Sequence, residues 1–422
     1  MKLHIGIDDT DSPEGGCTTY IGAIIIDILK EKGIEFLDYP HLIRLNPNIP
    51  FKTRGNGAVA LHISTDETKY NDIKNIIVNI VSEYSEREVR RFSEKTNPGI
   101  CFLKGEVPQI LKEFYKKALQ ELCTIRQAET IAKKVDADVI KIRKGRGIIG
   151  ALAAIGATLE EYTYELILYR TKEFIGTRRK IDKESVFYAH NKTYPQSFDL
   201  IDPSTKKLIL CPNTPCPVFA GIRGYSVDAV KKALKYIIPE EPIERSVIYK
   251  TNQATDCHFT YLRYIKDIKI FGNVIAIGMV CRNPITITGG HVIFSIKDET
   301  GSIDCAAYEP TREFRNIVRD LVIGDIVEVY GGVKLTTKNH ILTINLEKIK
   351  IIKLKEIKEK INPICKCGKS MSSMGKNQGY RCKKCRTKVF SSIKFKTKKR
   401  NLMENKIYVV PARSRRHLTK FL

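Results

Sequence analysis

Residues 6–19 read GIDDTDSPEGGCTT and connect two apolar segments near the start of the chain. Residues 3–7 predict a buried strand, and residues 17–31 have the length and apolar spacing of a helix. A strand that leads through a polar loop into a helix is typical of mixed α/β domains. We therefore expect an α/β domain whose first loop carries acidic and small residues.

Three carboxylates stand at the end of that predicted strand. Asp8, Asp9 and Asp11 are close in sequence, and carboxylate oxygens are ligands that Mg²⁺ prefers. The alternative interpretation is an acidic turn that caps the following helix. The spacing favours a metal-assisted site over a purely structural turn.

Small residues after the acids predict a phosphate site. Gly15 and Gly16 let the backbone close around an anion, and Thr18 or Thr19 can place a hydroxyl at the helix N-terminus. The loop lacks the Gly-Lys-Ser/Thr ending of a P-loop, so it would be a different kind of nucleotide site. A nucleoside triphosphate with Mg²⁺ is the expected ligand.

A second glycine-bearing loop, KTRGNG at residues 52–57, precedes another predicted strand. Its Gly55-Asn56-Gly sequence indicates a tight turn that would place Lys52 and Arg54 on a protruding corner. These cations could neutralise phosphate charge, whereas the alternative is an ordinary hairpin turn.

A third loop, KGRGIIG at residues 144–150, follows a predicted strand and opens a helix. Gly145, Gly147 and Gly150 match the pattern G-x-G-x-x-G, which is weak evidence by itself. Arg146 between two glycines is unusual for a dinucleotide fingerprint, so we interpret the loop as a second anion-facing loop. The alternative is that the glycines only allow close helix packing.

The α/β pattern continues through residues 1–260. Predicted strands at 58–64, 99–104, 138–142 and 165–169 alternate with predicted helices at 68–84, 108–122, 126–134, 148–155 and 227–236. Residues 58–122 suit half of a ferredoxin-like fold, and residues 239–242 read as a linker.

Residues 271–352 have strand spacing throughout. A strand pair region at 271–287 is followed by strands at 291–297 and 301–308, a helix at 311–321, and strands at 324–334 and 340–352. This order is typical of an OB-type barrel, which often binds single strands or tRNA-like ligands. A purely structural barrel is the alternative.

The charge is concentrated at the C-terminal end. The chain has 72 Lys+Arg and 47 Asp+Glu, a net charge of +25. Residues 361–422 contain one acid, Glu404, among many Lys and Arg residues. Such a basic tail predicts salt-sensitive nucleic-acid binding, and the alternatives are a solvated tail or a weak membrane-surface anchor.

Four of the twelve cysteines form two close pairs in that basic region. Cys365 and Cys367 are followed by Cys382 and Cys385, a spacing that predicts a zinc ribbon. Only one residue separates the first pair, which departs from the usual spacer of two. We expect the ribbon to bind Zn²⁺, because so small a segment has little core of its own.

The sequence shows no signal peptide and no apolar run long enough for a membrane span. Closely spaced cysteines in a reducing compartment more often bind metal than form disulfides. We therefore expect a soluble, cytoplasmic protein without a membrane partner.

Several motifs together resemble one family. Beside GIDDTDS at 6–12 and CTTY at 17–20, the chain has LIRLNP at 42–47, KTRGNG at 52–57, GRGIIGALAAIG at 145–156, NTPCPV at 213–218 and GIRG at 221–224. These motifs resemble the archaeal tRNA(Ile) 2-agmatinylcytidine synthetases, and the similarity runs from the first strand through the ribbon.

The resemblance implies a division into four domains. Residues 1–57 and 123–195 would form an ATP-binding kinase-like catalytic domain, and residues 58–122 and 196–250 a ferredoxin-like domain. An OB domain would follow at 265–355, and a zinc ribbon with a basic tail at 361–422.

The resemblance also implies an ATP-dependent ligase that joins agmatine to the wobble cytidine of the isoleucine tRNA with a CAU anticodon. Phosphorylation of the C2 oxygen would activate the base, and the agmatine amine would displace phosphate. Thr18 occupies the place of the family's phosphate-accepting threonine. Asp8, Asp9 and Asp11 would bind Mg²⁺ or assist the reaction.

A different class of function remains open at this stage. The α/β half could be a scaffold for a non-catalytic OB and zinc-ribbon protein that binds nucleic acid. The acidic loop argues against this, because Asp8, Asp9 and Asp11 would repel phosphate unless a metal were bound.

Overall fold

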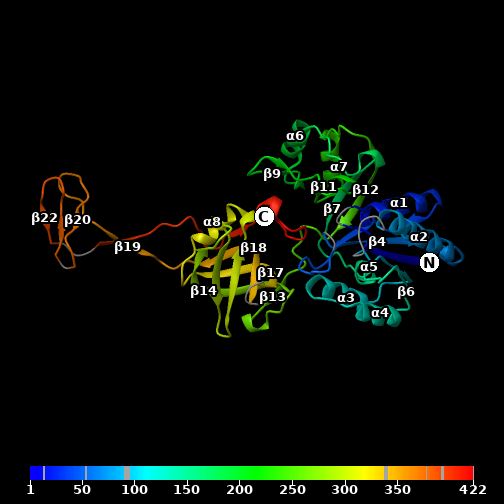
Figure 1. The fold of residues 1–422 in the computed structure, drawn as a ribbon, viewed down its shortest axis with the longest axis horizontal. Helices are drawn as coiled ribbons and strands as arrows, with labels where there is room; N and C mark the ends of the chain where they lie inside the picture. The colour runs from blue at the N-terminus through cyan, green and yellow to red at the C-terminus, as the bar shows by residue number, and fades with distance from the viewer. Residues whose placement is uncertain are drawn as a thin grey trace.

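The computed structural model describes residues 1–12, 15–52, 55–89, 96–336, 341–376, 378–390 and 394–421. Figure 1 shows an α/β part, a central barrel and a small, separate unit in a row. None of the helices in the described ranges is long and apolar enough to cross a membrane.

The α/β part is built on one ten-stranded sheet. Its strands are, in spatial order, β6 (Asp138–Lys141), β5 (Gly99–Lys104), β1 (Lys2–Asp8), β4 (Gly57–Ser64), β3 (His41–Arg44), β12 (Ile243–Thr251), β7 (Thr163–Arg170), β11 (Val218–Gly224) and β8 (Ser197–Phe198), with β2 (Glu35–Phe36) paired to β4. The parallel pairing of β3 with β12 joins the two halves of the sheet.

Helices cover both faces of this sheet. On one face lie α1 (Thr18–Glu31) and α2 (Tyr70–Tyr84), which share a core with alternate residues of β1 and β4. The opposite face of the first half is covered by α3 (Gln109–Gln120), α4 (Ile125–Lys134) and α5 (Ile148–Ile155). In the second half, α6 (Lys183–Thr193) and α7 (Val227–Tyr236) pack on β7 and β11.

Most of the predicted elements of the α/β part are present. The elements that were not predicted are the helix α6, the sheet strands β2, β3, β8, β11 and β12, and the two short strands Ile201–Asp202 and Lys207–Leu208. The expected linker at 239–242 is wrong, because it leads directly into β12 near the middle of the sheet. Glu241 is buried there and forms an ion pair with Arg170, so this segment is part of the core.

The pairing of the strands can be compared with the expected division of residues 1–250 into two domains. β1 pairs with both β4 and β5, although the division assigns β1 to the kinase-like domain and nearly all of β4 and β5 to the ferredoxin-like domain. The interleaved division of residues 1–250 therefore stays a prediction.

The central barrel has OB topology. Its strands are β14 (Asn273–Thr286), β15 (Val292–Lys297), β16 (Ser302–Ala307), β17 (Ile326–Leu335) and β18 (Leu342–Lys353), with α8 (Phe314–Arg319) after the third. Pairing of β14 with β17 closes the barrel. The expected strand pair at 271–287 is instead the single bent strand β14, and β13 (Thr260–Leu262) pairs alongside it.

The ribbon is an insertion that follows β18, the last of these barrel strands. A two-stranded stalk of β19 (Lys358–Ile361) and β23 (Lys394–Thr397) carries a sheet of β20 (Ser372–Ser373), β21 (Tyr380–Arg381) and β22 (Lys388–Val389). The chain then returns, adds β24 (Ile407–Val409) to β18, and ends between the barrel and the α/β part (Figure 1). Residues 407–421 are therefore packed against the rest of the molecule and do not form a free tail.

Shorter elements complete the chain. They are the strands β9 (Ile201–Asp202) and β10 (Lys207–Leu208), the 3₁₀ turns η1 (Glu67–Lys69), η3 (Lys172–Phe174), η4 (Ile265–Asp267), η5 (Glu309–Thr311) and η6 (Ala412–Ser414), and the π-turn η2 (Ser85–Val89).

Candidate active site

The predicted carboxylates lie in a surface cleft at the end of β1. The cleft brings together residues from all three predicted loops: Asp8, Asp9, Asp11, Lys52, Asn56, Arg146 and Gly147. Asp9 adopts a left-handed backbone conformation with φ 58°, which is uncommon for a non-glycine residue. The fold thus brings together segments that are far apart in sequence.

Burial and mutual repulsion disfavour the ionised acids. Burial, and then the charge of Asp9, raises the pKa of Asp8 well above its usual value. Burial likewise raises the pKa of Asp9 to about 6, although the guanidinium of Arg146 opposes the shift. A bound cation would relieve this repulsion, and carboxylate oxygens are ligands that Mg²⁺ prefers. The three carboxylates are not gathered as a metal site, however, because in the described residues only the four ribbon cysteines have ligand atoms that all lie within 4.8 Å of one another.

Arg146 is a basic partner that the loop sequence does not reveal. Its Nη2 lies 2.9 Å from Oδ2 of Asp9, and the Asn97 backbone N–H donates to the same oxygen at 3.2 Å. Arg146 thus faces the cleft, as predicted, but here it partly neutralises an acid.

The glycines of the third loop allow close packing. A Cβ on Gly150 would lie 1.9 Å from Oδ2 of Asp8, and a Cβ on Gly147 would lie 2.4 Å from the Asp8 carbonyl oxygen. Gly145 needs its positive φ of 62°. The packing interpretation therefore holds for these glycines, and the loop residues that line the cleft are Arg146, Gly147, Ile149 and Gly150.

The second loop also contributes to the lining of the cleft, through Lys52, Asn56 and Gly57. Lys52 donates a hydrogen bond to the Pro47 carbonyl, and burial together with the charge of Arg416 lowers its pKa to about 8. The Asn56 side chain donates to the Asn46 carbonyl at 2.9 Å. Arg54 lies outside the described residues.

The glycine and threonine residues of the first loop do not line the acidic cleft. Thr18 and Thr19 are buried at the start of α1, and the Thr10 hydroxyl donates to Oγ1 of Thr18 at 3.1 Å. Gly15 and Gly16 close a turn in which the Ser12 N–H donates to the Gly15 carbonyl at 2.8 Å. Neither glycine lines the cleft.

A second cavity of about 320 Å³ adjoins the acidic cleft. The two share Asp11, Asn56 and Gly57, and Thr18 and Thr19 line the second. Its volume is within the range of small-molecule sites. The predicted site residues therefore border two connected spaces.

A buried ionic network forms the far wall of this cavity. Arg223 donates from Nε to Oε1 of Glu165 at 3.2 Å and from Nη1 to Oδ2 of Asp199 at 3.3 Å. Although burial opposes ionisation, Arg223 and Arg44 hold the pKa of Glu165 below its usual value. The network fixes the charged groups around the cavity.

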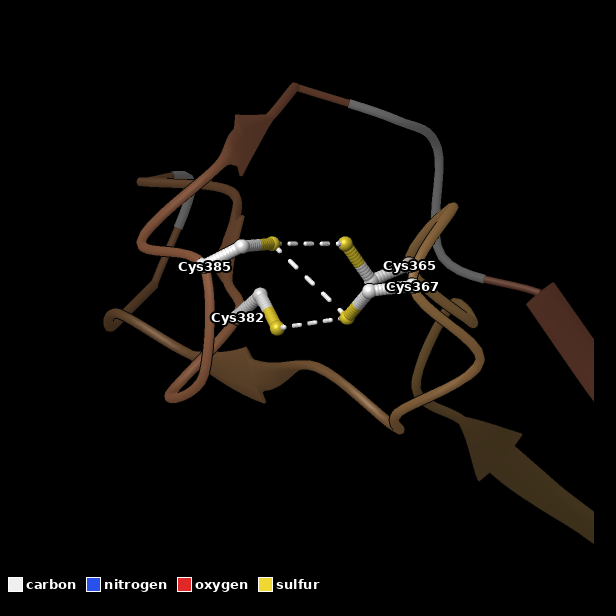
Figure 2. A group of neighbouring side chains, drawn as sticks. All are labelled: Cys365, Cys367, Cys382 and Cys385. Atoms are coloured by element: carbon white, nitrogen blue, oxygen red, sulfur yellow. Dashed lines mark hydrogen bonds between the residues drawn. The ribbon is translucent and has the colours of Figure 1, made fainter.

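The four ribbon cysteines converge on one point (Figure 2). Their sulfur atoms all lie within 4.8 Å of one another, and the Sγ separations are 3.3 Å for Cys365 and Cys385 and 3.5 Å for Cys367 and Cys382. Four thiolates at about 2.3 Å from a tetrahedral Zn²⁺ require similar separations. The single-residue spacer between Cys365 and Cys367 is therefore compatible with zinc.

Known proteins match the whole chain. Family models match as the TiaS TCKD domain at residues 4–144, the TiaS FLD domain at 145–258, an OB-fold nucleic acid binding domain at 269–352 and the TiaS C-terminal zinc ribbon domain at 362–402. The isoleucine tRNA 2-agmatinylcytidine synthetase TiaS of Pyrococcus horikoshii is 47% identical, with 100% of this chain and 96% of the relative covered. The chain belongs to the TiaS family of isoleucine tRNA 2-agmatinylcytidine synthetases.

Solved TiaS structures share the fold. The apo enzyme has a TM-score of 0.90 at 42% identity, covering 100% of this chain and 97% of the solved one. The complex of TiaS with isoleucine tRNA, AMPCPP and agmatine has a TM-score of 0.83 at 39% identity, with coverage of 100% and 96%. The family resemblance, the OB fold and the zinc ribbon inferred from sequence are confirmed.

Several residues of the second cavity were missed in the sequence. Arg44, Glu165 and Arg223 are charged residues inside otherwise apolar strands. A charge within a buried strand is costly unless it is paired, and that pattern could have identified them. His417 also lines the cavity, and nothing in its local sequence indicates this.

Proposed function

We propose that this protein uses ATP to join agmatine to C2 of the wobble cytidine of the AUA-reading isoleucine tRNA. The observation that carries the proposal is the acidic cleft opening beside a second cavity, with Asp11 and Asn56 common to both. The relatives named for this product, and the TiaS complex with isoleucine tRNA, AMPCPP and agmatine, support it.

The acidic cleft is the proposed nucleotide site. Asp8, Asp9 and Asp11 would hold Mg²⁺, which supplies positive charge to the phosphates of ATP. Lys52 and Arg146 line the same cleft as these acids and would stabilise charge on the transferring phosphoryl group. When phosphate enters, Arg146 can share its guanidinium between Asp9 and the phosphate. Arg54, Gly55 and Gly145 belong to the same two loops.

The proposed reaction has two displacements. The C2 carbonyl oxygen of cytidine attacks phosphorus, and the bond from phosphorus to the rest of the nucleotide breaks. The agmatine amine then attacks C2, loses a proton, and the carbon–oxygen bond breaks so that the oxygen leaves with phosphate. Phosphorylation is needed because the carbonyl oxygen alone is a poor leaving group.

Thr18 is the proposed phosphate acceptor of the protein itself: in a step separate from cytidine phosphorylation, its hydroxyl oxygen would attack phosphorus of ATP and lose its proton, and the bond from that phosphorus to the rest of the nucleotide would break. Thr18 lies at the start of α1, where free backbone N–H groups favour phosphate, and it borders the second cavity. Because Asp11 reaches both spaces, a phosphoryl group leaving the cleft would pass close to this threonine.

The tRNA would approach along the barrel and the ribbon. The target base must leave its stack to enter the second cavity, so a flipped wobble cytidine is expected. The zinc ribbon, with Zn²⁺ on its four cysteines, would present exposed cations to the tRNA backbone. We expect the reaction to take place in the cytoplasm, where tRNA is found.

The test is direct. The protein is incubated with a transcript of the isoleucine tRNA, ATP and agmatine, and the wobble nucleoside is weighed by mass spectrometry. We expect a nucleoside with the mass of the agmatine conjugate only when both ATP and agmatine are present. Tight tRNA binding with an unmodified nucleoside would instead indicate a non-catalytic binder.

A further inference from the structure

The last residues of the chain reach the second cavity. His417 and Leu418 accept backbone hydrogen bonds from Ala254 at 2.8 Å and Asp256 at 2.9 Å. Leu418 is 2% exposed and packs in the core formed with α3, α4 and α5. The segment of residues 413–421, here called the C-terminal segment, is thus held firmly against the α/β part.

This packing places the His417 imidazole in the wall of the cavity that Arg44 and Thr18 also line. Nη2 of Arg223 donates to Nδ1 of His417 at 2.8 Å. A guanidinium only donates hydrogen bonds, so Nδ1 accepts and the ring carries its proton on Nε2. The charge of Arg44, burial and Arg223 hold the pKa of His417 well below its usual value, so the ring is neutral.

The Nε2–H of His417 points to a corner that lacks a side chain. A Cβ on Gly55 would lie 3.3 Å from Nε2 of His417 and 2.8 Å from Nη1 of Arg44. Within the described part of the chain, neither Nε2 of His417 nor Nη1 of Arg44, the two atoms nearest to this corner, makes a hydrogen bond. Two donors of different elements therefore converge beside a glycine.

We propose that His417 and Arg44 bind a phosphate oxygen in this corner, so that the C-terminal segment supplies part of the substrate site. A neutral imidazole N–H and a guanidinium together suit an anionic oxygen. The oxygen belongs either to the phosphoryl group in transfer or to the backbone phosphate of the flipped nucleotide. This inference rests on the proposed function for the identity of the phosphate.

Three variants separate hydrogen bonding from packing. His417→Leu keeps side-chain bulk but removes both nitrogens, whereas His417→Gln keeps an acceptor and an N–H donor. Lys420→Ala is the matched control, because Lys420 lies in the same segment and its side chain pairs with Glu161 at an exposed site. Melting temperatures show whether each variant is folded.

The experiment measures turnover in tRNA modification and the Kd for tRNA. We expect His417→Leu to lose on the order of 10²-fold in kcat, as for removal of one donor to a developing oxyanion, with His417→Gln recovering part of it. Unchanged tRNA affinity then assigns the corner to the transferring phosphoryl group. A loss confined to tRNA affinity assigns it to the backbone phosphate.

Two results would overturn the inference. One is a His417→Leu protein with wild-type kcat and tRNA affinity, and the other is an equal loss in His417→Gln and His417→Leu. If the wild-type protein forms no agmatine conjugate, the proposed function fails separately. Thermal stabilisation by inorganic phosphate, expected in the wild type and reduced in His417→Leu, then decides the inference by itself.

Discussion

The zinc ribbon and the C-terminal segment come from the same basic stretch, yet their cations have different surroundings. Every Lys and Arg between Lys366 and Lys388 is exposed, and the sequence has no acid from 362 to 403. In the C-terminal segment, by contrast, Arg413, Arg415, Arg416 and Lys420 pair with acids of the α/β part and the barrel. Net charge alone therefore overstates the surface that is available to phosphate.

Removing the ribbon should show most clearly that its exposed cations, in contrast to the paired cations of the C-terminal segment, bind tRNA. Residues 362–393 can be replaced by a short turn, because β19 and β23 pair at Ile361 and Lys394. We expect tRNA affinity to fall on the order of 10²-fold and the slope of log affinity against log salt to flatten by about 0.7–0.9 per lost phosphate contact. ATP binding should not change. Unchanged salt dependence would show that the ribbon cations do not contact tRNA.

Zinc removal should reproduce that loss without any deletion. Cys382→Ser removes one thiolate, and a structural site of this kind contributes folding energy only while the metal is bound. We expect less than stoichiometric zinc by metal analysis, tRNA affinity close to that of the ribbon-excised protein, and an unchanged main melting transition. The exposed Ser373→Ala substitution is the control on the same small sheet. Full zinc content in Cys382→Ser would contradict the proposed ligand set.

The sequence predicts the ribbon better than the C-terminal segment for a physical reason. Four cysteines at metal-ligand spacing are a local pattern, as are the acids after β1. The pairing of Arg223 with Glu165, or of Arg416 with Glu347, joins residues that are far apart in sequence. Local sequence patterns carry no information about partners so far apart in the chain. From the sequence alone, the packed C-terminal end therefore looks like a basic tail.

Contacts between residues far apart in sequence also limited what could be predicted of the candidate active site. The acidic loop, Lys52 and Arg146 were predicted and share one cleft. The second cavity was not predicted, because its walls come from β3, β7, β11 and the C-terminal segment. The strand β12 was missed as well, since prolines at 239 and 242 made its approach resemble a linker.

Packing of the C-terminal segment should contribute to global stability. Leu418→Ala removes a side chain that is 2% exposed, and such core truncations cost about 2–5 kcal/mol of unfolding free energy. The matched ribbon change, Ile364→Ala, affects a residue that is 74% exposed and should change stability little. Denaturant unfolding measures both. Equal effects would mean that the C-terminal segment is not part of the cooperative core.

His417 should give the stability of the C-terminal segment a small pH dependence. Its folded pKa lies well below the unfolded value of about 6.5, so the unfolded chain binds more protons as pH falls below that value. Wild-type stability should therefore drop on acidification, and this part of the drop should be absent in His417→Leu. The measurement is the melting-temperature difference between the two proteins at pH 5 and pH 7.5. A difference independent of pH would contradict the neutral assignment.

The central claim is that the acidic cleft and Thr18 carry out ATP-dependent tRNA modification and are not needed for folding. Asp9 has a pKa raised to about 6, so its charge costs stability above that pH, and Asp9→Asn should melt no lower than the wild type at pH 8. The single most direct measurement is the amount of agmatine conjugate formed by Asp9→Asn, Thr18→Ala and Thr18→Ser, with their melting temperatures. We predict losses on the order of 10²–10³-fold for the first two and partial activity for Thr18→Ser, all in folded proteins. Full activity in Asp9→Asn and Thr18→Ala, or loss only together with unfolding, would contradict the account.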